Sequence, residues 1–360
     1  MVDDRLQEAF SDDVGSLWCR PIAVLDSPPD PLSFLRDFVY PHVPCIIRNA
    51  IESEKGGPLI LGLDDIVDLV GGEAELTVDV TPDGHGDCAR CVRKHPADGD
   101  WGVGKLFVKP HEQKMTLADF RNHLRKQEGS NAIDSAEDTD INGLSVLQTD
   151  SAPEGQSADL GRVEKKVVYY SRQNDCLRTE MNSLFSTNIF PSSLGFAEEC
   201  FNTGPPDAVN LWIGNQSSVS SMHKDHYENI FYVCKGQKEF ILCPPADVMF
   251  LHEREFMSSS FCPSGSGGWK VVADGDEKTK WIEPDVKKYM DNHAYADHFP
   301  DLRRSHPVKV LVSEGKGPPL MVNSNLATLT DSILGDAIYI PSLWYHRVTQ
   351  TCETVGINYW

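Results

Sequence analysis

The chain has few basic residues for its size. Its 360 residues include 33 lysines and arginines against 54 aspartates and glutamates, which gives a formal net charge of −21 at pH 7. Because a surface this acidic repels the phosphate backbone, we do not expect direct nucleic-acid binding. The same charge would steer a lysine-rich protein segment toward the surface, so it favours a basic protein partner.

Long apolar runs are also missing. No stretch of the sequence approaches the ~18 apolar residues of a membrane span. The acidic start of the chain, MVDDR, lacks the basic and apolar regions of a secretory signal peptide. We therefore expect a protein that is not inserted in a membrane and that resides in the cytoplasm, the nucleus or both.

Regularly spaced cysteines are absent as well. The ten cysteines show no repeating pattern, which argues against a disulfide framework and is typical of a reducing compartment. Cys88 and Cys91 form one Cys-x-x-Cys pair, with His85 and His95 nearby. A structural zinc site usually needs a second such pair, so a plain loop is the stronger interpretation and a metal site the weaker one.

A His-x-Asp tripeptide is the most informative feature that is present. His223 and Asp225 lie between two β-rich apolar runs, and a further histidine, His346, follows a third such run. Two imidazoles and one carboxylate from separate strands make a facial triad, which binds Fe(II) and leaves the remaining positions open. The alternatives are a solvated surface pair for the tripeptide and a buried core histidine for His346. The joint occurrence of all three residues weakens both.

Three strings extend this pattern into a resemblance. The sequence resembles the JmjC oxygenases at residues 221–229 (SMHKDHYEN), 236–240 (GQKEF) and 342–346 (SLWYH). The resemblance is strongest to the small JmjC enzymes that hydroxylate lysine residues of proteins. The similarity covers the chain from about Ile22 to Trp360, with interruptions. It implies a mainly β fold with flanking helices, the double-stranded β-helix of a cupin-like JmjC barrel. It also implies Fe(II), with 2-oxoglutarate and O2 as co-substrates.

The resemblance assigns the metal ligands and one cation. His223, Asp225 and His346 match the iron ligands of the family. Lys238 matches the lysine that pairs with the distal carboxylate of 2-oxoglutarate, a task that needs a cation on a strand facing the metal. A solvated hairpin lysine is the alternative for Lys238.

Further positions match residues that surround the co-substrate. Tyr169 and Ser220 match hydroxyl-bearing residues near its carboxylate, and Asn358 matches a strand asparagine that lines the pocket. Phe231 departs from the pattern, because close relatives carry a tyrosine there, and this puts one polar contact in doubt. Core packing is the alternative for Tyr169 and for Phe231.

We expect three regions along the chain. Residues 1–126 mix helical and strand patterns and should brace the barrel, whereas 127–162 are rich in Ser, Asp, Glu and Gly and should be disordered. Residues 163–360 should form the JmjC barrel, interrupted by flexible insertions near 258–268 and 316–335. The strands around the second insertion are usually joined by a short turn in relatives, and whether it is a genuine loop stays open.

Two oxygenase functions and two other classes follow from these patterns. Hydroxylation of a protein lysine comes first, and demethylation of a methylated histone lysine comes second because the same chemistry oxidises an N-methyl group. The complete ligand set disfavours a non-catalytic binding module, and the lack of a separate nucleophile constellation disfavours a peptidase. The expected partner is a basic protein, for example a GTP-binding protein or a histone, and a homodimer is left open.

Overall fold

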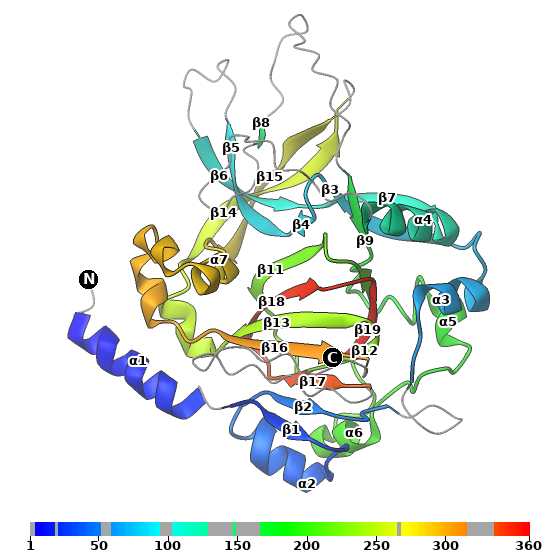
Figure 1. Ribbon diagram of the computed structural model, residues 1–360, viewed down its shortest axis with the longest axis horizontal. Coiled ribbons are helices and arrows are strands. Elements are labelled where there is room, and N and C mark those ends of the chain that lie inside the picture. The colour runs from blue at the N-terminus through cyan, green and yellow to red at the C-terminus, as the bar shows by residue number, and fades with distance from the viewer. Residues whose placement is uncertain are drawn as a thin grey trace, which may run out of the picture.

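Two facing β-sheets form the centre of the molecule (Figure 1). The computed structural model describes residues 4–18, 21–51, 59–93, 103–128, 147–148, 166–264, 268–314 and 335–360. The larger sheet has the strand order β1-β2-β17-β12-β19-β10, and the smaller one has the order β16-β13-β18-β11-β4. The chain switches sheet at every step from β10 to β13 and again from β16 to β19. This wiring is a double-stranded β-helix, so the expected mainly β fold with flanking helices is confirmed.

The eight barrel strands are short and antiparallel. They are β10 Val209–Gly214, β11 Val219–Lys224, β12 Asn229–Lys235, β13 Gln237–Cys243, β16 Val308–Ser313, β17 Ala337–Ile340, β18 Tyr345–Gln350 and β19 Thr354–Tyr359. Between the two sheets lies a core to which Phe231, Phe240 and Val310 belong. Residues on the opposite face of β12, such as Ile230 and Tyr232, belong to a second core. Strand β12 is apolar on both faces because both are covered.

The N-terminal region extends and covers the larger sheet. Strand β1 (Ala23–Leu25) pairs in parallel with β2 (Cys45–Ile47), which pairs antiparallel with β17. Between them, α2 (Pro31–Phe34) continues as a π-helical turn over residues 35–39. The side chain of Asp30 accepts a hydrogen bond from the Ser33 amide and so caps α2. Phe34 is buried and packs edge-on against Tyr339 of β17, which fixes α2 on the sheet.

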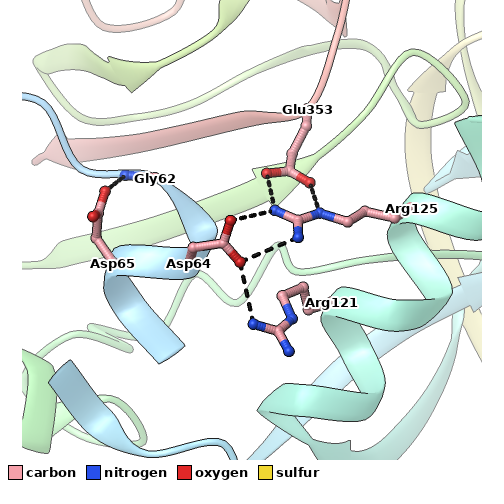
Figure 2. Close-up of polar contacts among 6 residues, drawn as sticks. All are labelled: Gly62, Asp64, Asp65, Arg121, Arg125 and Glu353. Atoms are coloured by element: carbon pink, nitrogen blue, oxygen red, sulfur yellow. Dashed lines mark hydrogen bonds and ion pairs between the residues drawn. The ribbon is translucent and has the colours of Figure 1, made fainter. Parts of the chain in front are cut away.

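A network of charged side chains ties two helices to the barrel (Figure 2). Arg125 of α4 (Leu117–Glu128) donates to both oxygens of Asp64, which belongs to α3 (Leu63–Val70). The same guanidinium donates to Glu353, which lies between β18 and β19. Each contact is partly exposed and contributes little alone. The shared arginine nevertheless sets how both helices lie relative to the barrel.

A third sheet lies beside the smaller barrel sheet, above it in the view of Figure 1. Its order is β15-β14-β6-β5-β8, with bounds β5 Cys88–Arg93, β6 Val103–Lys109, β8 Leu147–Gln148, β14 Glu253–Pro263 and β15 Trp269–Ile282. A separate three-stranded sheet joins β7 His111–Thr116, β3 Glu75–Thr81 and β9 Val167–Tyr169, and β4 His85–Gly86 pairs with β11. The remaining helical elements of the described chain are α1 Asp4–Trp18, α5 Asn182–Phe185, α6 Gly195–Phe201, η3 Pro245–Met249, α7 Val286–Asp291, η4 His293–Asp297 and η5 Pro300–Arg304. None of the helices in the described part combines the length and apolar composition needed to cross a membrane.

The prediction of a flexible insertion near 258–268 is wrong for the first half of that segment. Residues 258–263 belong to β14, which pairs with both β15 and β6, whereas residues 265–267 lie outside the described chain. The serines of this segment suggested a loop. Their hydroxyls are satisfied within the sheet instead, since Ser259 donates to the Phe107 carbonyl and Ser258 bonds to Thr279. Paired in this way, serine is compatible with a buried strand.

The two other expected insertions fall largely outside the described residues. Of 127–162, the first two residues end α4, and residues 147–148 form β8 in parallel pairing with β5, so disorder is wrong at those positions. Of 316–335, only the last residue is described. The backbone on either side is joined directly, because the Gly335 amide donates to the Glu314 carbonyl and the Asp336 amide to the Ser313 carbonyl.

This closure predicts that residues 317–332 can be removed. Replacing them with a two-residue Asn-Gly turn should change the melting temperature by no more than about 3 °C, because the hydrogen bonds at the two ends are retained. Thermal unfolding followed by circular dichroism measures the effect. As a control, Gly335→Val in the full chain should be clearly destabilising, because residue 335 has a φ of 54°. A drop of 10 °C in the deletion variant would mean that the segment packs on the barrel.

Candidate functional site

His223, Asp225 and His346 converge at one end of the barrel. Their ligand atoms all lie within 4.8 Å of one another. His223 on β11 is paired directly with His346 on β18, and Asp225 is the first residue after β11. The Asp225 carbonyl accepts a hydrogen bond from the Leu343 amide, which holds this short connection against the start of β18. Local strand pairing thus assembles all three side chains.

A β-bulge in β11 sets the register of the two histidines. Ser220 is paired with Val348, so an unbulged ladder would place Met222 opposite His346. The pairing shifts by one residue before His223, which places the imidazole rather than the methionine there. Met222 is buried in a different core, on the outer side of the smaller sheet. The extra residue therefore turns His223 toward His346.

Both imidazoles are held in the form that metal binding requires. His223 Nδ1 lies 2.7 Å from the Ser221 carbonyl oxygen, and His346 Nδ1 lies 3.0 Å from that of Trp344. A carbonyl oxygen only accepts hydrogen bonds, so each Nδ1 carries the proton and each Nε2 presents a lone pair. Trp281 of β15 stacks on the His223 ring at 2° between planes, with 5.8 Å between centroids, and fixes its orientation.

The electrostatics of the triad favour the same form. Burial, followed by the nearby His346, lowers the pKa of His223 to about 4. Burial alone would raise the pKa of Asp225, but the adjacent side chains of His346 and His223 outweigh burial and lower the pKa to about 2. A neutral imidazole beside a carboxylate is the protonation state in which these side chains bind a divalent cation. Two nitrogens and one oxygen on one side of a centre suit Fe(II).

Lys238 shares a cavity with the triad. This cavity is lined by Trp212, Ser220, His223, Asp225, Asn229, Phe231, Lys238, Phe240, His346, Val348 and Trp360. Lys238 is 3% exposed, and no ion pair joins its ammonium to a carboxylate of the described residues. Burial lowers its pKa to about 7. Because an unpaired buried ammonium is costly, the cavity favours an anionic ligand next to the metal position. The dicarboxylate 2-oxoglutarate fits this donor set.

Phe231 packs against this ammonium. Its ring centre lies 4.7 Å from Lys238 Nζ, and the ring of Trp212 lies 5.7 Å away. The glycine at position 356 leaves room for the phenylalanine ring, since a side chain there would collide with it. The position that departs from the family pattern thus supplies a cation–π contact, where a tyrosine would offer a hydroxyl.

The three other residues that the resemblance placed near the co-substrate, Ser220, Tyr169 and Asn358, lie at different distances from the Lys238 cavity: one lines it, one lines the adjoining cavity and one lies behind the lining. Ser220 lines both the Lys238 cavity and an adjoining one that contains Tyr169 and His223. The Tyr169 hydroxyl is buried without a hydrogen-bond partner in the described structure, so it is available to a ligand. Asn358 is fully buried and lies behind the Lys238 cavity rather than in its lining. It accepts from Trp212 Nε1 at 2.8 Å and donates to Asn229 at 3.1 Å. Asn358 therefore positions two residues that line the cavity.

Comparison with known proteins agrees with this geometry. The "Cupin-like domain" family profile matches residues 31–316 and 333–360. The chain is 28% identical to JmjC domain-containing protein E of Dictyostelium discoideum, over 100% of this chain and 91% of that protein. This chain belongs to the cupin-like JmjC family. Two further members are similar to it. Bifunctional peptidase and (3S)-lysyl hydroxylase JMJD7 of Homo sapiens is 29% identical over 95% of this chain and 85% of that protein. Lysine-specific demethylase JMJ32 of Arabidopsis thaliana is 28% identical over 93% and 80%.

Three cavity residues of this JmjC protein were missed in the sequence. Trp212 lies on β10, and Asn229 ends the string 221–229 and begins β12. The alternation of side chains along these two strands was the available signal. Trp281 had no such signal, because it reaches His223 from a hairpin that is not part of the barrel.

The Cys-x-x-Cys pair is neither a loop nor a supported zinc site. Cys88 and Cys91 lie on β5, and Arg90 Nε is 3.2 Å from the Cys88 sulfur. Among the described residues, the only group of metal-ligating side chains that converges is the triad of His223, Asp225 and His346. His95 lies outside the described chain.

We predict that His346→Ala abolishes metal binding and leaves the fold intact. An open metal site contributes less to folding than a closed structural one, so the melting temperature of the metal-free protein should hardly change. Co(II) titration followed by visible absorbance measures the site. His226→Ala, which changes an imidazole next to the triad, should retain the cobalt spectrum. An unchanged spectrum in His346→Ala would remove His346 from the ligand set.

We predict that Lys238→Met stabilises the protein in the absence of co-substrate. Burial lowers the pKa of Lys238 from its ordinary value of 10.5 to about 7 in the folded protein. Below pH 7 the ammonium is charged in both states and its burial destabilises the fold; this penalty fades between pH 7 and about 10.5. The variant should therefore gain roughly 1–4 kcal/mol at pH 6 and progressively less toward pH 10.

Urea unfolding at pH 6, 8 and 10 measures this gain. The exposed Lys235 offers a matched control, and Lys235→Met should show no comparable pH-dependent gain. Added 2-oxoglutarate should stabilise the metal-loaded wild type and not Lys238→Met. Destabilisation of Lys238→Met at pH 6 would mean that Lys238 has a partner when the site is empty of co-substrate.

Proposed function

We propose that this protein is an Fe(II)- and 2-oxoglutarate-dependent oxygenase that hydroxylates a lysine side chain of a basic protein substrate. The observation that carries the proposal is the union, in one cavity, of a His-Asp-His triad with an unpaired buried ammonium. The first provides three donors for a metal and the second provides a counter-charge for a dicarboxylate. Relatives named as a lysyl hydroxylase and a lysine demethylase support oxygenase chemistry on lysine.

Iron and 2-oxoglutarate supply the oxidising chemistry when they are bound. The chain's own residues supply geometry and a dry cavity. His223, Asp225 and His346 would hold the metal from one side, and Lys238 would hold the far carboxylate of the co-substrate. Phe231 and Trp212 shield that ammonium from water, which strengthens its attraction for a carboxylate. Ser220, which lines the same cavity, can donate one further hydrogen bond.

Charge supports the choice of substrate. The net charge of −21 favours encounter with a basic protein, for example a GTP-binding protein or a histone. Such substrates are found in the cytoplasm and the nucleus, where we place the enzyme. Demethylation of a methylated lysine is the second candidate, and the name of JMJ32 is the observation that favours it.

Mass spectrometry of products separates the two oxygenase reactions. Lysine-containing proteins and methylated histone peptides are incubated with the enzyme, Fe(II) and 2-oxoglutarate. We expect one oxygen atom to be gained on lysine, with stoichiometric succinate. Formaldehyde release with loss of a methyl group would favour the demethylase instead. Turnover of 2-oxoglutarate at the wild-type rate by Asp225→Ala would overturn both, because this variant lacks a metal ligand.

A serine, a histidine and an aspartate lie in a row that resembles the catalytic triad of a serine peptidase. The name of the relative JMJD7 includes peptidase activity, so this arrangement needs to be considered. Ser11, His306 and Asp247 form a chain in which Ser11 Oγ lies 3.4 Å from His306 Nε2, and His306 Nδ1 lies 2.9 Å from Asp247. No sequence pattern indicated this arrangement. Ser11 Oγ donates to the Arg304 carbonyl at 2.9 Å, and none of the three residues lines the cavities around the triad. Among the described residues, these contacts connect α1 to Arg304, His306 and Asp247 and lie away from the cavities at the triad.

We therefore predict that a fluorophosphonate probe does not label Ser11. The Ser11 hydroxyl donates its proton to the Arg304 carbonyl oxygen rather than to His306. His306 is therefore not placed to activate Ser11 by removing that proton. Labelling is measured by intact-protein mass spectrometry, with chymotrypsin as the positive control. Labelling of the wild type that Ser11→Ala removes would make the peptidase a serious candidate.

A further inference from the structure

A second cavity adjoins the iron triad on the side of the β14–β15 hairpin. His223 and Trp281 line it together with Asp87 and Tyr169. It shares Asp87, Ser171 and Gln173 with an outer cavity of about 520 Å³ that also contains Asp79 and Glu112. These shared residues place the two cavities side by side. The carboxylate of Asp87 therefore lies at the junction between the outer cavity and the cavity that reaches the metal ligand His223.

Asp87 is held rigidly at this junction. Its carbonyl accepts a hydrogen bond from Ser221 Oγ, which in turn accepts one from Trp281 Nε1. The backbone of Asp87 is left-handed, with a φ of 47°. Its carboxylate makes no hydrogen bond or ion pair with any described residue, and the nearby Lys109 is paired with Asp274 at 3.0 Å instead. A fixed, partly buried carboxylate without a partner faces a cavity beside the iron triad.

Tyr169 provides a second unused group in the same cavity. Its side chain is 7% exposed, and its hydroxyl has no hydrogen-bond partner among the described residues. The hydroxyl lies against Gly86, next to Asp87 in the chain, where any larger residue would collide with it. A phenol can donate to a carboxylate and accept from an N–H at the same time. Tyr169 can therefore serve the co-substrate and a cationic ligand together.

We infer that Asp87 and Tyr169 form a subsite for the unmethylated ammonium of a substrate lysine. Trp281, which packs between His223 and Phe107 and lines the cavity, offers an apolar contact for the aliphatic part of that side chain. The proposal rests on the oxygenase function proposed above and specifies what it recognises. Carboxylate and hydroxyl oxygens accept N–H donors. A trimethylated lysine has none and is usually bound by several aromatic rings instead.

The test uses Asp87→Asn, which removes charge and little else. Asparagine adopts a left-handed backbone as readily as aspartate and has nearly the same shape. Glu255→Gln is the control, because it removes one negative charge from an exposed site on the β14–β15 hairpin, which also carries Trp281. Each protein is immobilised with Fe(II) and 2-oxoglutarate in the absence of oxygen. Three randomised dodecapeptide libraries are passed over it, with lysine, norleucine or trimethyl-lysine fixed at the centre.

Wild type and Glu255→Gln should retain the lysine library roughly tenfold or more above the norleucine library, and also above the trimethyl-lysine library. Asp87→Asn, at an unchanged melting temperature, should bring the lysine-to-norleucine ratio close to one. Equal retention of lysine and norleucine by the wild type would overturn the subsite. So would equal or greater retention of trimethyl-lysine, or an unaltered ratio in Asp87→Asn.

Wild-type succinate production with a lysine protein tests the oxygenase function separately. If succinate forms while the libraries are not distinguished, only the subsite fails. If no succinate forms but the lysine preference depends on Asp87, the proposed function fails and the cation-binding subsite stands.

Discussion

The pairing of β11 with β18 is the constraint on which the site depends. Side chains alternate between the two faces of a strand, so a shift of one residue exchanges the inner and outer sets. The bulge before His223 is such a shift, and it puts an imidazole where Met222 would otherwise face His346. The same sheet places Lys238 on the face of β13 that also bears Phe240, opposite inward-facing residues of β18. The two histidines and the anion counter-charge therefore depend on the two ladders that pair β18 with β11 and β13.

The buried lysine shows how binding capacity and stability oppose each other here. An ammonium with aromatic rings and no carboxylate around it lowers the stability of the folded chain when the cavity is empty. Pairing it inside the protein would relieve that cost and would also cancel the attraction for an incoming carboxylate. The barrel tolerates this cost because core packing and the backbone pairing of the neighbouring strands stabilise the fold independently of Lys238. Part of the stability of the fold is thus given up so that an anion can be bound.

The sequence predicted the parts of the site that local patterns carry. His223, Asp225 and His346 stood beside β-rich runs, so their strands could be anticipated, whereas the place of Lys238 in the site came from the resemblance to the JmjC oxygenases. Trp281 could not be anticipated, because its contact with His223 depends on how a hairpin far along the chain crosses the barrel. The strand β14 was not predicted for a related reason. Its buried serines form hydrogen bonds with residues of other strands, and the strand propensity of a single segment does not include such contacts.

The direct backbone contact between residues 314 and 335 has a consequence for how this barrel can change. Backbone hydrogen bonds hold residues 314 and 335 together, so these two points of the fold stay adjacent whatever length of polypeptide joins them. The entropy lost in closing such a loop grows only with the logarithm of its length, about 0.6 kcal/mol for each doubling. Chain can therefore be gained or lost at this point in evolution at small thermodynamic cost, without displacing a metal ligand.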